Sequence, residues 1–376
     1  MYLKDVVKLL KELIEIPSPL YEEEEIANYV GNWLERSGLE VEYQYVEKGR
    51  PNVISWVKGK YDDVKIMLVG HLDTFSIGDE AIEAKVIDDS IWGRGAVDMK
   101  GAIAAMMSAF SRVSKLNLKY TAVLGLVVDE EGKGKGSELL VTRVRSEKAI
   151  VGEPTNFSVS PLQSGLLEIE LLVRGVRTHV TLPEHGVNAY DEVVKVLNYI
   201  KGIHIFKDRG PLPYMYSTFV ISKVICGEES WSIPKHCRVH VVMSLLPWQD
   251  PDVIFDELSK ASVKLISDDC ELLISMVDDD LGFWLINWEE TFSTLVDVIK
   301  STIGKVHISY MRSWCDANNL YHKGGIPTVI FGPGDLRLAH SDSERISISD
   351  VVLASEVYYR VLVKELEAKR ENREGF

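Results

Sequence analysis

Histidine and acidic side chains in this chain follow apolar, β-branched runs, where a strand would deliver them to the edge of a sheet. His71 and Asp73 close the run KIMLVGHLD, and Glu130 and Glu131 close the run TAVLGLVVDEE. Alternate residues of an extended segment point to one side, so the Asp73 carboxylate can accept a hydrogen bond from the ring nitrogen that His71 does not give to a metal. Adjacent carboxylates at the end of a buried strand repel each other unless a cation or a proton compensates. These four positions therefore indicate a site that holds a cation or a shared proton.

Three further residues have the same chemistry and similar positions. Asp98 lies in the glycine-rich stretch WGRGAVDMKG, Glu153 follows an apolar strand in VGEPT, and His340 follows a Gly-Pro-Gly turn in GPGDLRLAHS. Each fits an ordinary structural role when taken alone, and Asp98 could simply cap the helix that follows it. Together with the first group, they supply the nitrogen and oxygen ligands of a divalent metal such as zinc, cobalt or manganese.

The order of six motifs resembles a known enzyme family. GHLDT is followed by GRGAVDMKG, DEEGKGKGS, GEPT, RTHVTLPEHGVNA and GPGDLRLAHS. This order resembles the di-zinc peptidases and deacylases that include acetylornithine deacetylase, succinyl-diaminopimelate desuccinylase, aminoacylase and glutamate carboxypeptidase, and the resemblance covers nearly the whole chain. It implies two divalent metal ions, with zinc as the expected metal and cobalt or manganese as alternatives. The implied ligands are His71, Asp98 and Glu153 for one ion and Asp98, Glu131 and His340 for the other.

The resemblance also implies three catalytic residues that are not metal ligands. Glu130 is the expected general base, which takes a proton from the water bridging the two ions, and Asp73 is expected to orient His71. His179, in the motif THVTLPEHG, is the expected oxyanion-stabilising residue. In dimeric members it reaches from the smaller domain into the partner's active site. The resemblance therefore implies a homodimer formed through that domain, with a small molecule as substrate and amino-acid biosynthesis as the setting.

The expected reaction is hydrolysis of an amide bond in an N-acyl amino acid or a related small substrate, as in acetylornithine deacetylase or succinyl-diaminopimelate desuccinylase. Two alternatives share this chemistry. GPGDLRLAHS is also similar to the archaeal and thermophilic branch that releases lysine or ornithine from a carrier-protein-linked precursor, and an aminopeptidase or carboxypeptidase would differ only in its pocket. A non-catalytic homologue would share the fold, but it would have no need of Glu130.

The sequence departs from the family pattern where members bind a substrate carboxylate. Many members carry an Asn shortly before a Val/Ile-Pro pair and an Arg in a DxR stretch. Here the corresponding stretches read SWSIP and VMSLLP, with Trp231 and Ser244 at those positions. A serine cannot replace the bidentate clamp of an arginine on a carboxylate. Either another cation takes over, for which Arg312 in RSWCDANN is the best candidate, or the substrate differs from a standard N-acyl amino acid.

The elements that must position these residues predict an α/β fold with two domains. Strands are predicted at residues 53–57, 64–69, 121–128, 166–173, 217–225, 238–246 and 264–276. The first three alternate with helices, which indicates a mixed sheet flanked by helices, with ligands beyond the carboxyl ends of its strands. The later strands and two helices follow the order βαββαβ. We therefore expect a catalytic domain of residues 1–163 and 281–376, interrupted at residues 164–280 by a smaller α+β sandwich that serves as lid and dimerisation domain.

Composition sets further limits. The chain has 376 residues, a formal charge of −15 and 46% hydrophobic residues, which suits a globular protein of two domains. Its acidity argues against nucleic-acid binding, which requires a basic surface. The N-terminus lacks the features of a signal peptide and no apolar run is long enough to span a membrane, so we expect a cytoplasmic protein without a membrane partner. The four cysteines are expected to be reduced, and residues 22–25 to be a solvated helix start.

Overall fold

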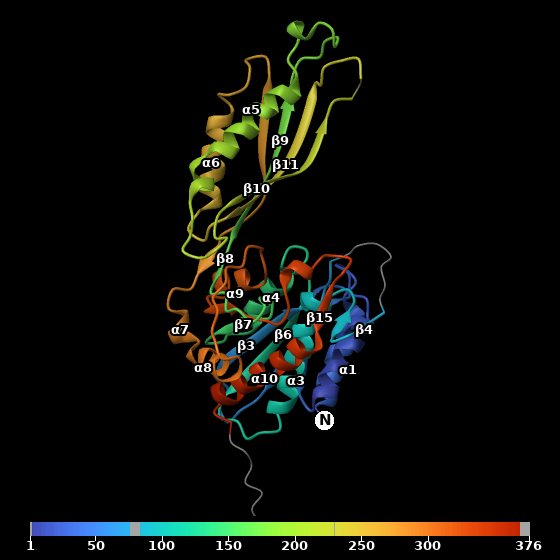
Figure 1. Ribbon diagram of the computed structural model, residues 1–376, viewed down its shortest axis with the longest axis vertical. Coiled ribbons are helices and arrows are strands. Elements are labelled where there is room, and N and C mark those ends of the chain that lie inside the picture. The colour runs from blue at the N-terminus through green and yellow to red at the C-terminus, as the bar shows by residue number, and fades with distance from the viewer. Residues whose placement is uncertain (1, 76–82, 229, 369–376) are drawn as a thin grey trace, which may run out of the picture. The chain divides into compact units, whose positions relative to one another are not determined.

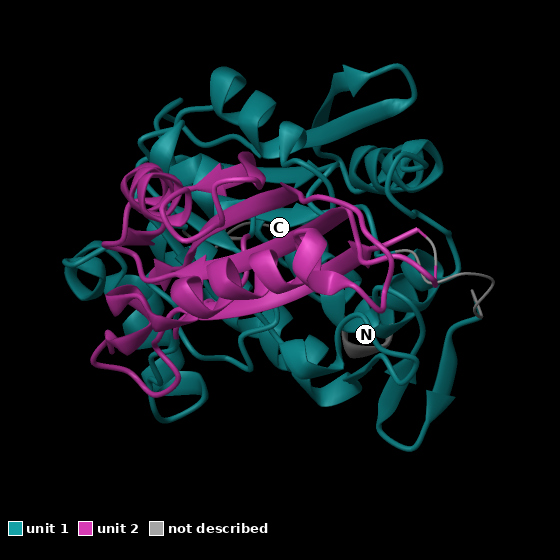
Figure 2. Cartoon of the chain, turned by 90° about the horizontal axis from the view of Figure 1, so that it is seen from above, with its two compact units in different colours: residues 1–161, 285–309, 315–376 teal, residues 162–284, 310–314 magenta. Residues whose placement is uncertain are grey.

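Two compact units make up the chain in the computed structural model, which describes residues 2–75, 83–228 and 230–368 (Figure 1). Unit 1 comprises residues 1–161, 285–309 and 315–376, and unit 2 comprises residues 162–284 and 310–314 (Figure 2). The smaller unit is therefore inserted into the larger one, and the chain returns to it briefly at residues 310–314. None of the described helices is both long and apolar enough to cross a membrane.

Unit 1 is built around a mixed sheet. Its six strands lie in the order β1 (Glu40–Glu47), β2 (Arg50–Val57), β6 (Thr121–Val127), β3 (Val64–His71), β7 (Ala149–Val151) and β14 (Thr328–Ile330). β3 runs parallel to both β6 and β7, and β14 runs parallel to β7. β2 pairs antiparallel with β6, and β1 with β2. The carboxyl ends of four parallel strands therefore meet at one edge of the sheet.

Helices cover both faces of this sheet. On β3, Ile66 and Leu68 lie in one hydrophobic core, whereas the alternate residues Met67 and Val69 are buried outside it, so neither face is open to water. The first core also contains residues of α1 (Tyr2–Ile14), α2 (Glu24–Arg36), α3 (Gly101–Val113), α8 (Ser293–Thr302) and α10 (Ile348–Glu365). α4 (Lys135–Arg143) and α9 (Ala317–His322) pack against each other and against strands of the sheet. The predicted α/β class is confirmed.

Unit 2 is an antiparallel sheet with two helices on one face. Its four strands lie in the order β10 (Thr218–Cys226), β11 (His236–Leu245), β9 (Gly165–Arg174) and β12 (Glu271–Asp280). Buried residues alternate with more exposed ones along β9 and β11, and the buried set forms a core with α5 (Ala189–Gly202) and α6 (Pro251–Ser262). The chain order of these elements is the βαββαβ order that the sequence predicts.

The last strand of the four-stranded sheet begins later than the sequence indicates. The strand predicted at residues 264–276 is β12, and it starts at Glu271. The preceding turn is anchored to α5, because the backbone N–H and the hydroxyl of Ser267 donate to the Glu192 carboxylate at 3.0 and 2.9 Å. Residues around Ser267 are therefore held against the helix rather than in the sheet.

Short elements complete the two units. β15 (Arg345–Ser347), β5 (Ser90–Trp92) and β4 (Lys85–Ile87) form a three-stranded sheet, β8 (Leu162–Gln163) pairs with β13 (Phe283–Trp284), and α7 (Trp288–Thr291) precedes α8. β8 and β13 lie where the chain enters and leaves unit 2.

The expectation that all four cysteines are reduced is wrong for two of them. Cys226 and Cys237 occupy facing positions of β10 and β11 and form a disulfide. They are 11 positions apart in the sequence, without the CxxC spacing, and it is the antiparallel register that brings them together. Cys270 and Cys315 are not disulfide-bonded.

Candidate active site

The carboxyl ends of three neighbouring strands bring together most of the residues that the sequence singles out. His71 is the last residue of β3, Glu130 and Glu131 follow β6, and Glu153 follows β7. Because β3 lies between β6 and β7 and runs parallel to both, these residues share one edge of the sheet. Asp98 joins them from the segment that leads into α3, and the peptide bond after it is cis.

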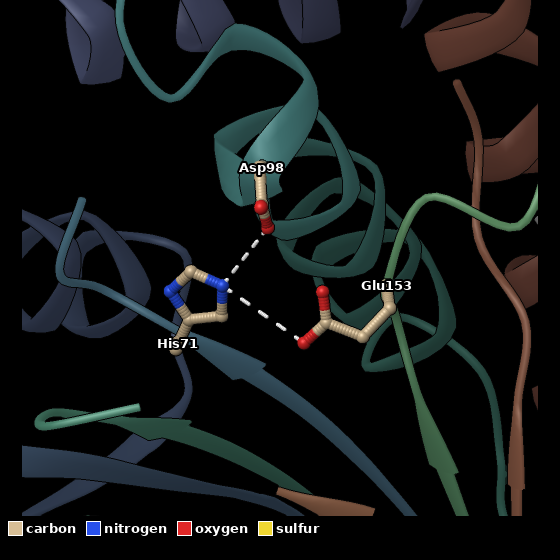
Figure 3. Close-up of side chains that lie close together, drawn as sticks. All are labelled: His71, Asp98 and Glu153. Carbon is tan, nitrogen blue, oxygen red and sulfur yellow. Dashed lines mark hydrogen bonds and ion pairs between the residues drawn. The ribbon is translucent and has the colours of Figure 1, made fainter. Parts of the chain in front are cut away.

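Asp98 belongs to two groups of candidate metal ligands. Its Oδ1 is 3.1 Å from Nε2 of His71, and its Oδ2 is 3.5 Å from Nε2 of His340. Beside His71, Oε1 of Glu153 is 3.9 Å from the same ring nitrogen (Figure 3). Beside His340, Oε1 of Glu131 is 2.9 Å from Nε2. Within each group of three residues the possible ligand atoms all lie within 4.8 Å of one another, so the two groups overlap at Asp98.

The hydrogen bond made by His71 settles which of its ring nitrogens is free. Nδ1 lies 2.9 Å from the backbone carbonyl oxygen of Asp73, and because a carbonyl oxygen only accepts, Nδ1 carries a hydrogen, so in the neutral, metal-binding ring Nε2 carries the lone pair. That lone pair faces carboxylate oxygens of Asp98 at 3.1 Å and of Glu130 and Glu153 at 3.9 Å. Buried lone pairs that face one another need a cation or a proton between them. The donor set and its orientation therefore fit a divalent metal ion.

The pKa values of these groups show the same excess of negative charge. Burial lowers the pKa of His71, but the charges of Glu130 and Glu153 and the hydrogen bond to Asp98 outweigh it and hold that pKa well above its usual value. Burial raises the pKa of Glu130 and of Glu153 well above the ordinary range. Burial acts in the same direction on Asp98, but the hydrogen bond and charge of His71 hold its pKa below the usual value. Without metal, the site therefore retains protons that divalent cations would displace.

Asp73 accepts hydrogen bonds from His71 and Glu131. The bond from His71 differs from the one that the sequence predicts. Oδ1 of Asp73 is 3.8 Å from Nδ1 of His71, which is too far for a hydrogen bond, so its backbone carbonyl orients the ring instead. Its Oδ2 accepts the backbone N–H of Glu131 at 2.9 Å. Burial raises the pKa of Asp73 to about 7. Asp73 thus links the ends of β3 and β6, one through its main chain and the other through its side chain.

His340 is the most accessible member of the group. Its side chain is 42% exposed, and its φ of 54° lies in the left-handed region. The imidazole stacks on the ring of Phe75 with centroids 4.3 Å apart. The hydrogen bond to Glu131 raises the pKa of His340.

Glu344 supports Asp98 and was missed by the sequence reasoning. Its Oε1 accepts the backbone N–H groups of Val97 and Asp98 at 3.2 and 3.3 Å, and its Oε2 is 2.6 Å from Nη1 of Arg94. Its place four residues after His340 was an available signal. The same segment requires Gly95, whose φ is +76° and where a Cβ would come within 2.7 Å of the Thr74 side chain.

Asp316 is a second residue to which the sequence reasoning gave no role in the site. It is fully buried, and after burial its charge is among the causes that raise the pKa of Asp73, Glu130 and Glu153. Burial raises the pKa of Asp316 to about 6. The stretch RSWCDANN was singled out for Arg312, and the acidic residue within it was the available signal.

His179 is not part of this group, because it belongs to unit 2. It lies in the connection between β9 and α5 and is exposed. The backbone N–H of Thr181 donates to its Nδ1 at 3.3 Å, so in the neutral ring Nε2 carries the hydrogen and can donate it. The imidazole lies beside Trp231, with ring centroids 6.4 Å apart.

The positions that depart from the family pattern also lie in unit 2. The side chain of Trp231 is 74% exposed. Ser244 is on β11, and its hydroxyl donates to the backbone oxygen of Arg312 at 3.3 Å. The guanidinium of Arg312 lies 4.9 Å from the centroid of the Tyr216 ring and is exposed. Arg312 therefore lies next to the position where the family pattern would place an arginine.

Comparison with known proteins decides the class of enzyme. Residues 67–364, more than half of the chain, match the model of peptidase family M20/M25/M40. The chain belongs to this family. As an M20 protein it is a metal-dependent hydrolase, and its His, Asp and Glu residues form the candidate ligand groups described above.

Relatives of this M20 chain match over almost its whole length. It is 28% identical over 359 residues to a putative LysW-lysine/LysW-ornithine hydrolase of Pyrococcus abyssi, covering 95% of this chain and 93% of the relative. It is 30% identical over 367 residues to a protein of the same description from Aeropyrum pernix, covering 94% of each. The solved structure of aminopeptidase PepT from Bacillus cereus shares its fold, with a TM-score of 0.80 at 19% identity over 97% of this chain and 99% of that one.

Proposed function

We propose that this M20 chain is a two-metal amide hydrolase that releases lysine or ornithine from a precursor in which the amino acid is linked to a carrier protein. The position of Asp98 supports the hydrolytic part, because its two oxygens face His71 and His340 at 3.1 and 3.5 Å. The names of the Pyrococcus and Aeropyrum relatives support the substrate.

The proposed metal centre uses both groups that meet at Asp98. One ion would be bound by His71, Asp98 and Glu153, and the other by Asp98, Glu131 and His340. Zinc is the expected metal, with cobalt and manganese as alternatives, because all three accept nitrogen and oxygen ligands. Two such ions, when bound, supply an activated water and polarise the scissile carbonyl group.

Glu130 is the proposed general base. Its Oε2 lies 3.9 Å from Nε2 of His71, so it is beside the ligand groups without being a member of either. Burial raises its pKa, which suits a group that must accept a proton from water and then pass it to the leaving amine near neutral pH.

His179 is the proposed oxyanion donor. The hydrogen on its Nε2 is free to donate because Nδ1 accepts from Thr181, and a preorganised donor of this kind stabilises a tetrahedral intermediate. The chain enters unit 2 through β8, which comes just before the amino end of β9, and His179 comes after the carboxyl end of β9. The whole length of β9 therefore separates His179 from the point where the chain enters unit 2. We therefore propose that His179 serves the active site of a partner subunit in a homodimer.

An N-acyl amino acid is the second candidate substrate. The position of Arg312 supports it. The Arg312 backbone lies against Ser244, so its exposed guanidinium can bind a free α-carboxylate in place of the missing arginine. Lysine and ornithine carry the same carboxylate, so the choice between the two candidates depends on the acyl side of the amide.

The test is hydrolysis of a substrate panel with zinc or cobalt added. It contains γ-glutamyl-lysine and γ-glutamyl-ornithine as mimics of the carrier-linked amino acid, N-acetyl and N-succinyl amino acids, and simple dipeptides. Glu130→Gln and a chelator serve as blanks, and Glu138→Gln, an exposed glutamate on the nearby helix α4, is the matched control. Turnover of the γ-glutamyl compounds that is lost only in the blanks is the expected result. Turnover confined to the acetyl or succinyl compounds would establish the second candidate, and no turnover despite bound metal would overturn both.

A further inference from the structure

A buried ion network lies next to the segment that carries Glu130 and Glu131. Arg50, the first residue of β2, donates from Nε and Nη2 to the two carboxylate oxygens of Glu23 at 2.8 and 2.6 Å. Its Nη2 also donates to Oδ1 of Asp129 at 2.7 Å. The side chains of Glu23, Arg50 and Asp129 are at most 4% exposed. The expectation of a solvated helix start at residues 22–25 is therefore wrong for Glu23.

Asp129 transmits this contact to the backbone around the proposed base. It immediately precedes Glu130 and has a φ of +72°, which non-glycine residues rarely adopt. While its Oδ1 is held by Arg50, its Oδ2 accepts the backbone N–H groups of Lys133 and Lys135, both at 3.2 Å. The turn that contains Glu130 and Glu131 is thus folded around one carboxylate, and Arg50 fixes that carboxylate in place.

Two other side chains hold the remaining sides of this turn. Asn52, two residues beyond Arg50 on β2, accepts the backbone N–H of Val128 at 3.1 Å and donates to the carbonyl oxygen of Gly136 at 2.8 Å. Asp73 accepts the backbone N–H of Glu131 at 2.9 Å. With Asp129 held by Arg50, the turn is fixed at its start, its middle and its end.

Stability alone is a poor reason for this network. Two carboxylates and one guanidinium leave a net negative charge in the interior, and buried ion pairs are often no more stabilising than apolar residues of similar size. A base, by contrast, must be held to a fraction of an ångström, because small displacements lower catalytic rates steeply. The placement of Asp129 directly before Glu130 is what a positioning role requires.

We propose that Glu23 and Arg50 are positioning residues, which act through Asp129 to set the directions of the Glu130 and Glu131 carboxylates. The proposal rests on the function proposed above only for the role of Glu130 as base. It predicts that loosening the network changes the chemical step and the metal environment while the fold and substrate binding persist.

The test compares Glu23→Gln, Arg50→Lys and Asp129→Asn with the control Arg143→Lys. Arg143 makes a bidentate pair with Glu42 at 2.9 and 2.8 Å, and that pair is exposed. Each network variant is expected to lower kcat by about tenfold or more with KM within about twofold, whereas the control keeps both. Because Arg50 acts through Asp129, the loss of kcat caused by Arg50→Lys should largely disappear when Asp129→Asn is already present.

A second readout does not depend on turnover. The visible absorption of the cobalt-loaded protein reports the ligand geometry of the ion that Glu131 would bind, and it should change in the network variants and not in Arg143→Lys. Glu23→Gln keeps the shape of the side chain and is the variant that tests the proposal if the others fold poorly. Variants that unfold at lower temperature yet keep both kcat and the cobalt spectrum would overturn the proposal. If the wild-type protein hydrolyses nothing in the panel, the function proposed above fails, and the cobalt spectrum alone decides the positioning role.

Discussion

Asp73 orients His71 through its backbone carbonyl oxygen, which lies 2.9 Å from Nδ1 of the ring, and not through its carboxylate, which is 3.8 Å away. The carboxylate instead accepts the backbone N–H of Glu131. The two functions of Asp73 can therefore be separated, because a side-chain substitution leaves the carbonyl in place.

Asp73→Asn and Asp73→Ala should differ in activity. Asparagine retains an acceptor for the Glu131 N–H and resembles the protonated acid, which burial favours by raising the pKa of Asp73 to about 7. We expect kcat of Asp73→Asn to stay within about tenfold of wild type, and Asp73→Ala to lose roughly another tenfold because a partly buried N–H is left without its acceptor. Steady-state kinetics measure both. An equal, large loss in the two variants would mean that the carboxylate itself orients His71.

His340→Ala should remove one of two bound ions. His340 belongs only to the group formed with Asp98 and Glu131, so the group around His71 keeps its three residues. Because the His340 side chain is 42% exposed, its removal should cost little folding stability. Metal content after dialysis, measured by elemental analysis, should fall from about two ions per chain to about one. The matched control is His322→Ala, which lies at the end of α9 outside both groups; the same loss in that variant would contradict the assignment.

The affinity for metal should increase as pH rises, and the stability of the metal-free protein should decrease. The folded chain holds the pKa values of His71, His340, Glu130 and Glu153 above their usual values, so folding without metal takes up protons. The free energy of unfolding of the metal-free protein should therefore fall as pH rises above 4.5, the ordinary glutamate value, and through the raised pKa values. Bound metal displaces these protons and removes the penalty.

Thermal unfolding with chelator or with zinc, at several pH values between about 5.5 and 8, measures this effect. The difference in Tm between the loaded and metal-free forms should grow with pH. A His71→Ala variant lacks one ligand and one of the groups with a raised pKa. Its Tm difference should therefore grow less with pH. A Tm difference that stays constant across this range would contradict the proton displacement.

Several parts of the site follow from local sequence patterns. His71 ends one apolar strand and Glu153 follows another, and parallel strands place such residues at one edge of a sheet, so their meeting could be predicted from strand order alone. The hydrogen bond from His71 to the backbone carbonyl of Asp73 could not be predicted. Every residue has a carbonyl group, and no residue type indicates that this one is used. The pairing of Cys226 with Cys237 could have been predicted, because the predicted strands on either side of them form a hairpin.

The buried network shows the limit of reading charges from sequence. Glu23 lies in an acidic run at a helix start, which is ordinarily solvated, and its partner Arg50 is 27 residues away. Asp129, the other partner, is a further 79 residues beyond Arg50. Which charges face one another depends on β2 lying beside β6, and no local pattern reports that pairing.

The proposed role of His179 in a partner subunit makes a prediction about mixed dimers. Glu130→Gln lacks the base and His179→Ala lacks the oxyanion donor, so each should be nearly inactive alone, with a loss of about a hundredfold or more. In a mixed dimer, the active site that keeps Glu130 belongs to the His179→Ala chain, and the intact His179 comes from the other chain. One complete site therefore forms in each mixed dimer.

Random pairing gives mixed dimers in about half of the population, with one complete site of two, so refolding equal amounts together should restore roughly a quarter of wild-type activity. A mixture of Glu130→Gln with Glu131→Gln is the control: both changes lie in unit 1, and a mixed dimer restores no complete site. If His179 served its own chain, mixing would restore nothing, because neither chain would hold both residues. Recovery in the first mixture and none in the control would establish that the active site is completed across a dimer.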